Sequence, residues 1–121
     1  MDIKSFVFNA FYENTYLLAS SNLETLILDP GCYEDFEKKE LTDCIKTNKL
    51  KPIAIINTHC HIDHVLGNDY LKKLYEIPLW IPAMEKNLLK SVSTYAPTMG
   101  IQDYQEAQPD KLLSEKDVIA F

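Results

Sequence analysis

The chain has 121 residues, enough for one domain at most, and its 46% hydrophobic and 11% aromatic content allows a buried core. No run approaches the ~20 apolar residues of a membrane span, and the first residues, M-D-I-K-S-F, do not resemble a secretory signal, so we expect a cytoplasmic protein without a membrane partner. The formal net charge is −6 and all twelve basic residues are scattered lysines, which argues against nucleic-acid binding. Cys32, Cys44 and Cys60 form no C-x-x-C pair, so we expect reduced, mostly buried thiols.

The N-terminal part predicts an antiparallel meander. Three short runs rich in β-branched and aromatic residues cover 3–9, 14–20 and 24–29, and polar Asn and Ser residues separate them. The sequence Asp29-Pro30-Gly31 should end the third strand, because proline cannot extend a central strand and glycine permits a sharp reversal.

Helices and strands alternate after this meander, which predicts a mixed α/β (α+β) fold. The spacing of apolar residues predicts an amphipathic helix over 34–48 and another over 68–76, where Leu71, Leu74 and Tyr75 share one face. The unbroken apolar run before the first histidine reads as a strand covered on both sides, as in parallel sheets. Residues 78–82 form a further short strand.

The last third of the chain predicts one helix, a loop and the start of a strand. The helix should run from about Ala83 to Ala96, with its inward face made by Met84, Leu88, Val92 and Tyr95. Residues 101–111 are polar and predict a loop, and a strand should begin near 112. The apolar run 118–121 at the chain end suggests an incomplete piece of a longer domain.

Residues 57–68 read N-T-H-C-H-I-D-H-V-L-G-N and contain every histidine of the chain. Side chains alternate in an extended segment, so His59 and His61 should point the same way and Cys60 the other way. Asp63 and His64 follow the bend toward the next helix and should reach a second position close by. This spacing suits two metal ions, with one pair of ligands for each ion.

The ligand types favour Zn²⁺, with Fe or Mn as alternatives, because imidazole and carboxylate groups predominate and no thiolate pair is present. Two such ions ~3.5–4 Å apart lower the pKa of a shared water from about 15.7 to about 7, so that hydroxide can attack an acyl carbon. Asp63 is also our candidate catalytic residue. The competing interpretation makes the three histidines solvated or capping residues of a loop.

The histidine motif and the N-terminal strands resemble those of a known family. The run T-H-C-H-I-D-H-V-L-G-N over 58–68 resembles the T-H-x-H-x-D-H signature of the metallo-β-lactamase superfamily, and N-T-Y-L-L together with L-D-P-G most resembles its glyoxalase II-like hydrolases. The resemblance implies that residues 1–121 are the N-terminal half of an αββα sandwich that hydrolyses a thioester or related acyl substrate. It assigns His59 and His61 to the first ion and Asp63 and His64 to the second.

The resemblance also implies that Asp29 orients ligand imidazoles, although Asp29 could equally be a simple turn residue before Pro30. Family members add a third histidine, a bridging aspartate and a final histidine from their C-terminal half, and no histidine follows His64 here. We therefore expect this chain to be inactive alone, and to self-associate or pair with a missing C-terminal half. The alternatives are a non-catalytic metal-binding module, or a half-site that another chain completes. A lactonase or an iron-dependent oxygenase also remains open, whereas a nuclease is disfavoured by the charge.

Overall fold

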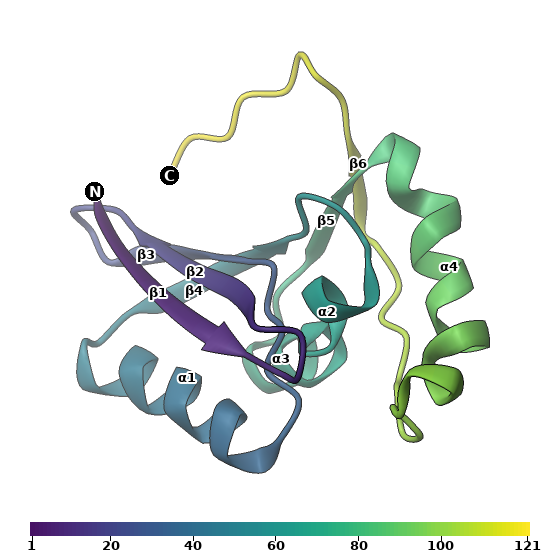
Figure 1. Cartoon of the computed structure of the whole chain (residues 1–121). Helices are drawn as coiled ribbons and strands as arrows, with labels where there is room; N and C mark the ends of the chain where they lie inside the picture. Colours follow the sequence, from purple (N-terminus) through teal and green to yellow (C-terminus); the bar gives the residue numbers. More distant parts are fainter.

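A computed structural model describes residues 1–121, and its centre is one six-stranded sheet with the strand order β1-β2-β3-β4-β5-β6 (Figure 1). The first three strands pair antiparallel and the remaining neighbours pair parallel, which confirms both the predicted meander and the predicted parallel strand before the histidines. The strands are β1 (Asp2–Phe8), β2 (Glu13–Ala19), β3 (Glu24–Leu28), β4 (Lys51–Ile56), β5 (Leu79–Pro82) and β6 (Lys111–Leu113).

The helices are α1 (Asp35–Thr47), α2 (Ile62–Val65), α3 (Asn68–Tyr75) and α4 (Lys86–Tyr95), with short 3₁₀ helices η1 (Ala83–Glu85) and η2 (Ala96–Met99). None of them has the length and apolar character needed to cross a bilayer. The mixed α/β fold class is therefore as predicted. The one-turn helix α2, inside the histidine motif, is too short for a periodic pattern to reveal.

Two predicted inward faces are partly wrong. Met84 is 82% exposed, and Leu89 takes the buried place in α4 beside Val92. The segment begins as the 3₁₀ helix η1, whose three residues per turn shift the phase of the side chains relative to a continuous α-helix. In α3, Leu74 is 50% exposed, and the buried residues of that short helix are Asn68 and Leu71.

The main core lies between the sheet and the helices on one of its faces. Buried residues of the strands meet buried residues of α1 and α3 there; the largest include Leu17, Ile27, Leu41, Ile55 and Leu71. The central position of β4 explains its unbroken apolar sequence, because it pairs with β3 on one side and β5 on the other and is covered on both faces.

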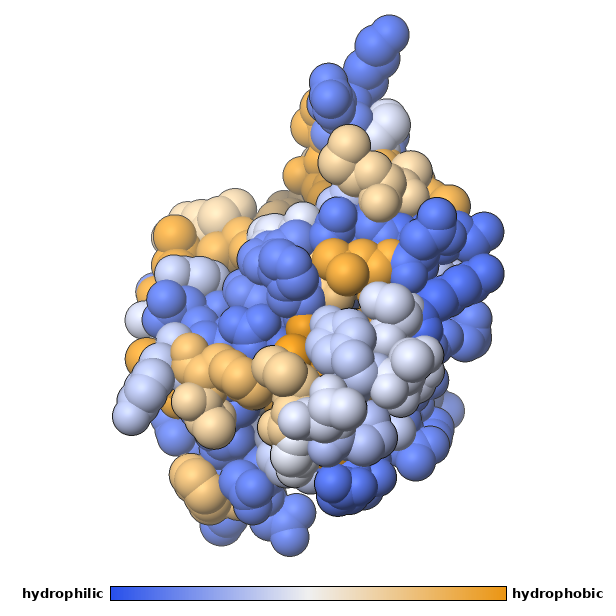
Figure 2. Space-filling view, turned by 45° about the vertical axis from the view of Figure 1, so that its right-hand side comes forward, coloured by the Kyte–Doolittle hydropathy of each residue, from blue (hydrophilic) through white to orange (hydrophobic).

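The other face of the sheet carries a smaller apolar cluster. Leu26, Ala54 and Ile56 are buried there, and Ile119 and Phe121 of the C-terminal segment pack against them. That segment lies above the sheet in Figure 1 and forms the projection at the top of Figure 2, which is blue at its tip and has orange side chains nearer its base. Near the sheet edge Ile3 and Val7 remain exposed, so this face is only partly covered. The predicted strand near 112 is only Lys111–Leu113 long.

The start of α1 is fixed by a buried glutamate. Glu37 accepts hydrogen bonds from the backbone N–H groups of Tyr33 and Glu34, and its other carboxylate oxygen accepts one from Asn9 N in the turn after β1. Glu37 therefore caps α1 and joins the helix to the β1–β2 turn.

We expect Glu37→Ala to lower the free energy of unfolding by about 2 kcal/mol, because three backbone donors lose their acceptor at once. Urea denaturation would measure the change. The matched control is Glu40→Ala, which removes an exposed carboxylate from the same helix and should have little effect. Equal effects of the two substitutions would show that the cap does not stabilise this junction.

Candidate metal centre

The histidine motif leaves the sheet at the carboxyl end of β4 and is fixed there by a buried amide pair. Asn57 and Asn68 are both fully buried and exchange hydrogen bonds of 3.1 and 2.8 Å through their side-chain amides. The Asn57 amide also lies 3.3 Å from the backbone oxygen of His64, to which it donates. The two ends of the loop are thus tied together, which holds the motif in one conformation.

The three imidazoles lie side by side. The ring centroids of His59 and His61 are 4.9 Å apart, and those of His59 and His64 are 3.9 Å apart. His61 is exposed and immediately precedes α2, whereas His59 and His64 are half-buried. The structure therefore brings together the side chains that the sequence suggested as ligands, and it does so at the surface, where an ion has access.

His64 is held between carboxylates. Its Nδ1 lies 3.3 Å from Asp29 Oδ2 and 3.6 Å from Glu13 Oε1, and its Nε2 lies 3.4 Å from Asp63 Oδ2. With the proton on Nδ1, the lone pair of Nε2 is available beside the Asp63 carboxylate. Two ligand atoms that each lie ~2.0–2.2 Å from a tetrahedral zinc ion are about 3.3–3.5 Å apart. The Asp63–His64 pair therefore has the spacing of two ligands of one ion.

The chain has no group of three or more His, Cys, Asp or Glu side chains that could hold one metal ion together. The assignment of two ligands from these residues to each ion stays a prediction. Catalytic zinc usually has three protein ligands, so ions held by this chain alone would be bound weakly.

Asp29 is not a solvated turn residue. Its side chain is buried, and its two carboxylate oxygens accept hydrogen bonds from the backbone N–H and the hydroxyl of Thr58, at 2.7 and 2.6 Å. The backbone of Asp29 has a φ of 51°, in the left-handed region. These contacts join the end of β3 to the start of the histidine loop and place the Asp29 carboxylate next to the Nδ1 atom of His64.

Glu13 is a component of this site that we did not predict from the sequence. It is 3% exposed, its Oε1 has no hydrogen-bond partner, and that atom faces the equally unpartnered Nδ1 of His64. Burial raises the pKa of Glu13 to about 8, and the charges of Asp29 and Asp63 add to this effect, whereas the hydrogen bond with Thr15 opposes it. The only available signal was a glutamate directly before the predicted strand 14–20.

Cys60 lies inside the motif but turns away from the imidazoles. It is fully buried in the main core, and burial raises the pKa of its thiol to about 12. Its backbone N–H donates a 2.8 Å hydrogen bond to Glu85, which fixes the loop against η1. Cys60 therefore packs as a small apolar residue, as the alternation of side chains predicted.

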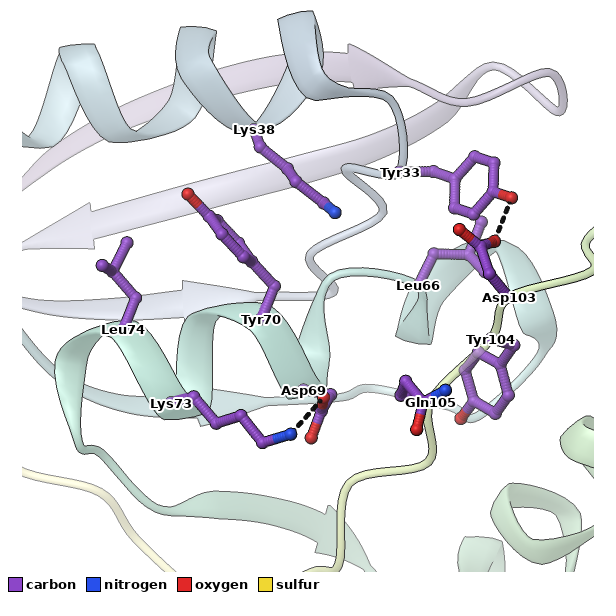
Figure 3. Close-up of a pocket in the computed structure, with 10 residues that line it drawn as sticks. All are labelled: Tyr33, Lys38, Leu66, Asp69, Tyr70, Lys73, Leu74, Asp103, Tyr104 and Gln105. Carbon is purple, nitrogen blue, oxygen red and sulfur yellow. Dashed lines mark hydrogen bonds and ion pairs between the residues drawn. The ribbon is translucent and has the colours of Figure 1, made fainter.

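The chain also has a cavity of about 470 Å³ between α1 and α3, which none of the predicted ligands lines (Figure 3). Its charges are mostly paired: Lys73 contacts Asp69 at 3.0 Å, and the Tyr33 hydroxyl donates to Asp103. Lys38 extends from α1 over the ring of Tyr70, with its Nζ 4.9 Å from the ring centroid. This cavity is separate from the histidine cluster.

The sequence of this chain is similar to those of known hydrolases. The chain is 36% identical over 80 residues to the probable metallo-hydrolase YqgX of Bacillus subtilis, and the aligned region covers 66% of this chain and 36% of that protein. It is also 36% identical over 84 residues to the hydroxyacylglutathione hydrolase of Nitrosomonas europaea, covering 69% of this chain and 30% of that enzyme. The chain thus spans about a third of the length of these two relatives.

Solved structures show the same fold. The B3 metallo-beta-lactamase BLEG-1 superposes with a TM-score of 0.80 at 26% identity, over 98% of this chain and 56% of the other. TTHA1623 in a di-iron-bound form superposes with a TM-score of 0.82 at 25% identity, over 96% of this chain and 56% of the other. Residues 9–118 match the sequence profile of the metallo-beta-lactamase superfamily, a family of metal-dependent hydrolases. The chain therefore belongs to the metallo-beta-lactamase superfamily.

Proposed function

We propose that residues 1–121 form the N-terminal half of a cytoplasmic, binuclear metal-dependent hydrolase that cleaves a thioester or a related acyl compound. The observation that carries this proposal is the grouping of His59, His61, Asp63 and His64 at the carboxyl end of β4, with Asp29 behind His64. A relative of the chain is named a hydroxyacylglutathione hydrolase, an enzyme whose substrate is a thioester.

The donor set fits two zinc ions, with iron or manganese as alternatives, one beside His59 and His61 and one beside Asp63 and His64. Bound ions would activate water and polarise the acyl carbonyl. Hydrolysis of a thioester breaks the carbonyl carbon–sulfur bond, forms a bond from that carbon to the oxygen of water, and leaves a carboxylic acid and a thiol. Asp29, 3.3 Å from Nδ1 of His64, would keep that ring oriented, and Asp63 would supply a carboxylate ligand to the second ion.

The partly covered sheet face fits this proposal. Exposed Ile3, Val7 and Tyr16 lie on the face that α1 and α3 do not cover, and a further layer of structure would bury them. We infer that this layer, whether a C-terminal half or a second copy of the chain, also brings the missing ligands. With this layer in place, each ion would have three protein ligands instead of two, which is the number that catalytic zinc usually has.

A thioesterase assay with zinc tests the proposal on two proteins: the 121-residue chain and the longer protein that the proposal requires, in which a C-terminal half follows this chain. Release of thiol from an S-acyl thioester should be undetectable for the shorter protein and clear for the longer one. His61→Ala in the longer protein should abolish turnover. Robust turnover by the 121-residue chain, or turnover that survives His61→Ala, would contradict the assignment of the ligands.

A further inference from the structure

A second cavity lies directly beside two of the proposed ligands. It has a volume of about 450 Å³, and His61 and Asp63 form one wall. The other walls come from three separate segments: Phe11 from the β1–β2 turn, Leu88 and Tyr95 from α4, and Met99 from η2. A group bonded to an acyl carbon held at the metal centre would extend into this space.

Hydrogen bonds attach one wall of the cavity to the histidine motif. In the β1–β2 turn, the Asn9 side-chain amide donates hydrogen bonds of 2.9 Å to the backbone oxygen of Asp63 and 3.0 Å to that of Gly31, and Asn9 Oδ1 accepts one from Phe11 N. The position of Phe11 relative to Asp63 is thereby fixed before any ligand binds.

The cavity is largely apolar. No lysine lines it, and its one carboxylate is that of Asp63. Burial raises the pKa of Tyr95, so its side chain stays a neutral phenol near neutral pH. By contrast, the cavity between α1 and α3 is lined by Lys38 and Lys73 (Figure 3). In the metal-free chain, a carboxylate or phosphate in the cavity beside His61 would find no lysine to pair with and would lie near the charge of Asp63.

We propose that this cavity binds an uncharged, apolar acyl chain of the substrate, and that Phe11, Tyr95 and Met99 select for it. The inference rests on the proposed function only in that the occupant is an acyl group. Phe11 and Met99 are still 39% and 45% exposed, so an alkyl chain would bury apolar surface on both. Each added methylene should tighten binding by about threefold until the cavity is full.

The three methionines of the chain allow a direct test, because only Met99 lines the cavity. Met1 and Met84 lie outside the cavity and are 77% and 82% exposed. The chain would be labelled at the methionine methyl carbons and titrated, with a chelator present, with acetamide, butanamide and hexanamide. The Met99 signal should shift saturably, with affinity rising along the series, and those of Met1 and Met84 should stay in place. Succinamate, which has the four carbons of butanamide but ends in a carboxylate, should bind at least about tenfold more weakly.

Phe11→Ser should weaken hexanamide binding by about tenfold, whereas Tyr12→Ser, which removes an exposed aromatic ring from the same turn but not from the cavity, should leave it unchanged. Circular dichroism spectra like that of the parent chain would show that both variants retain the fold. The proposal is overturned if Met99 does not respond, if all three signals move alike, if succinamate binds as tightly as butanamide, or if the two variants behave alike. Because the titration needs neither metal nor turnover, its failure is distinguishable from failure of the hydrolase proposal.

Discussion

The double substitution His59→Ala/His61→Ala should weaken zinc binding by at least about 100-fold and should reduce the number of ions bound per chain. Removing groups that merely orient ligands typically costs 10–100-fold, and this change removes the whole ligand pair of one proposed ion. His61 is exposed and His59 half-buried, so the fold should survive. Calorimetry and elemental analysis of untagged, dialysed protein would give the affinity and the stoichiometry.

The control for this experiment is Ser93→Ala/Thr94→Ala, a pair of changes at exposed positions of α4 far from the motif in the sequence. It should bind zinc as the parent chain does. An unchanged stoichiometry in the histidine variant, with circular dichroism showing an intact fold, would remove His59 and His61 from the ligand set. The Asp63–His64 pair would then be the only part of the assignment left to test.

Glu13 should make the metal-free chain less stable as the pH rises. Burial raises its pKa from the ordinary 4.5 of a glutamate to about 8 in the folded chain, so the folded state binds the proton more tightly than the unfolded state does. The stability that the neutral carboxyl group provides is present below about pH 4.5 and is lost as the pH rises to 8. Between pH 5 and pH 8 we expect a loss of about 3 kcal/mol that Glu13→Gln, which cannot ionise, does not show.

The Thr15 hydroxyl offsets only part of this burial effect. It donates a 2.7 Å hydrogen bond to Glu13 Oε2, which favours the ionised carboxylate and lowers the pKa of Glu13. The same hydroxyl lies 2.9 Å from the backbone oxygen of Asp29 and has only one proton, so it cannot donate to both oxygens at once.

Urea denaturation at pH 5 and pH 8 with a chelator would measure the effect of Glu13. The control is Glu40→Gln, which alters an exposed glutamate of α1 and should keep the pH dependence of the parent chain. If Glu13→Gln and the parent chain lose equal stability between the two pH values, Glu13 is ionised at both. The account of its burial would then be wrong.

Much of the fold follows from local features of the sequence. Alternating and periodic apolar residues predicted the strands and most of the helices, and the histidine motif was placed correctly after the buried strand β4. Such patterns work because each depends on neighbours in the chain. They failed at Met84, where a 3₁₀ turn changed the phase of the side chains.

The role of Gly31 shows what local patterns miss. We expected it to permit a reversal, yet the left-handed backbone conformation is at Asp29. Gly31 is needed for space instead, because a Cβ atom there would lie 2.2 Å from Glu13 Oε2 and 2.5 Å from the backbone oxygen of Asp63. Glu13 and Asp63 are distant from Gly31 in the sequence, so the residues around Gly31 could not predict these contacts.

The sequence by itself determined that three imidazoles and a carboxylate follow a buried strand, since spacing and strand alternation are properties of the chain. Only the tertiary structure decided which residues lie next to these side chains. Strand β3 runs antiparallel to β2 and parallel to β4, so the first residue of β2, Glu13, and the residue after β3, Asp29, meet the end of β4 at one edge of the sheet. Residues 35 and 51 positions before His64 thereby lie next to its Nδ1 atom, a proximity that depends on strand pairing.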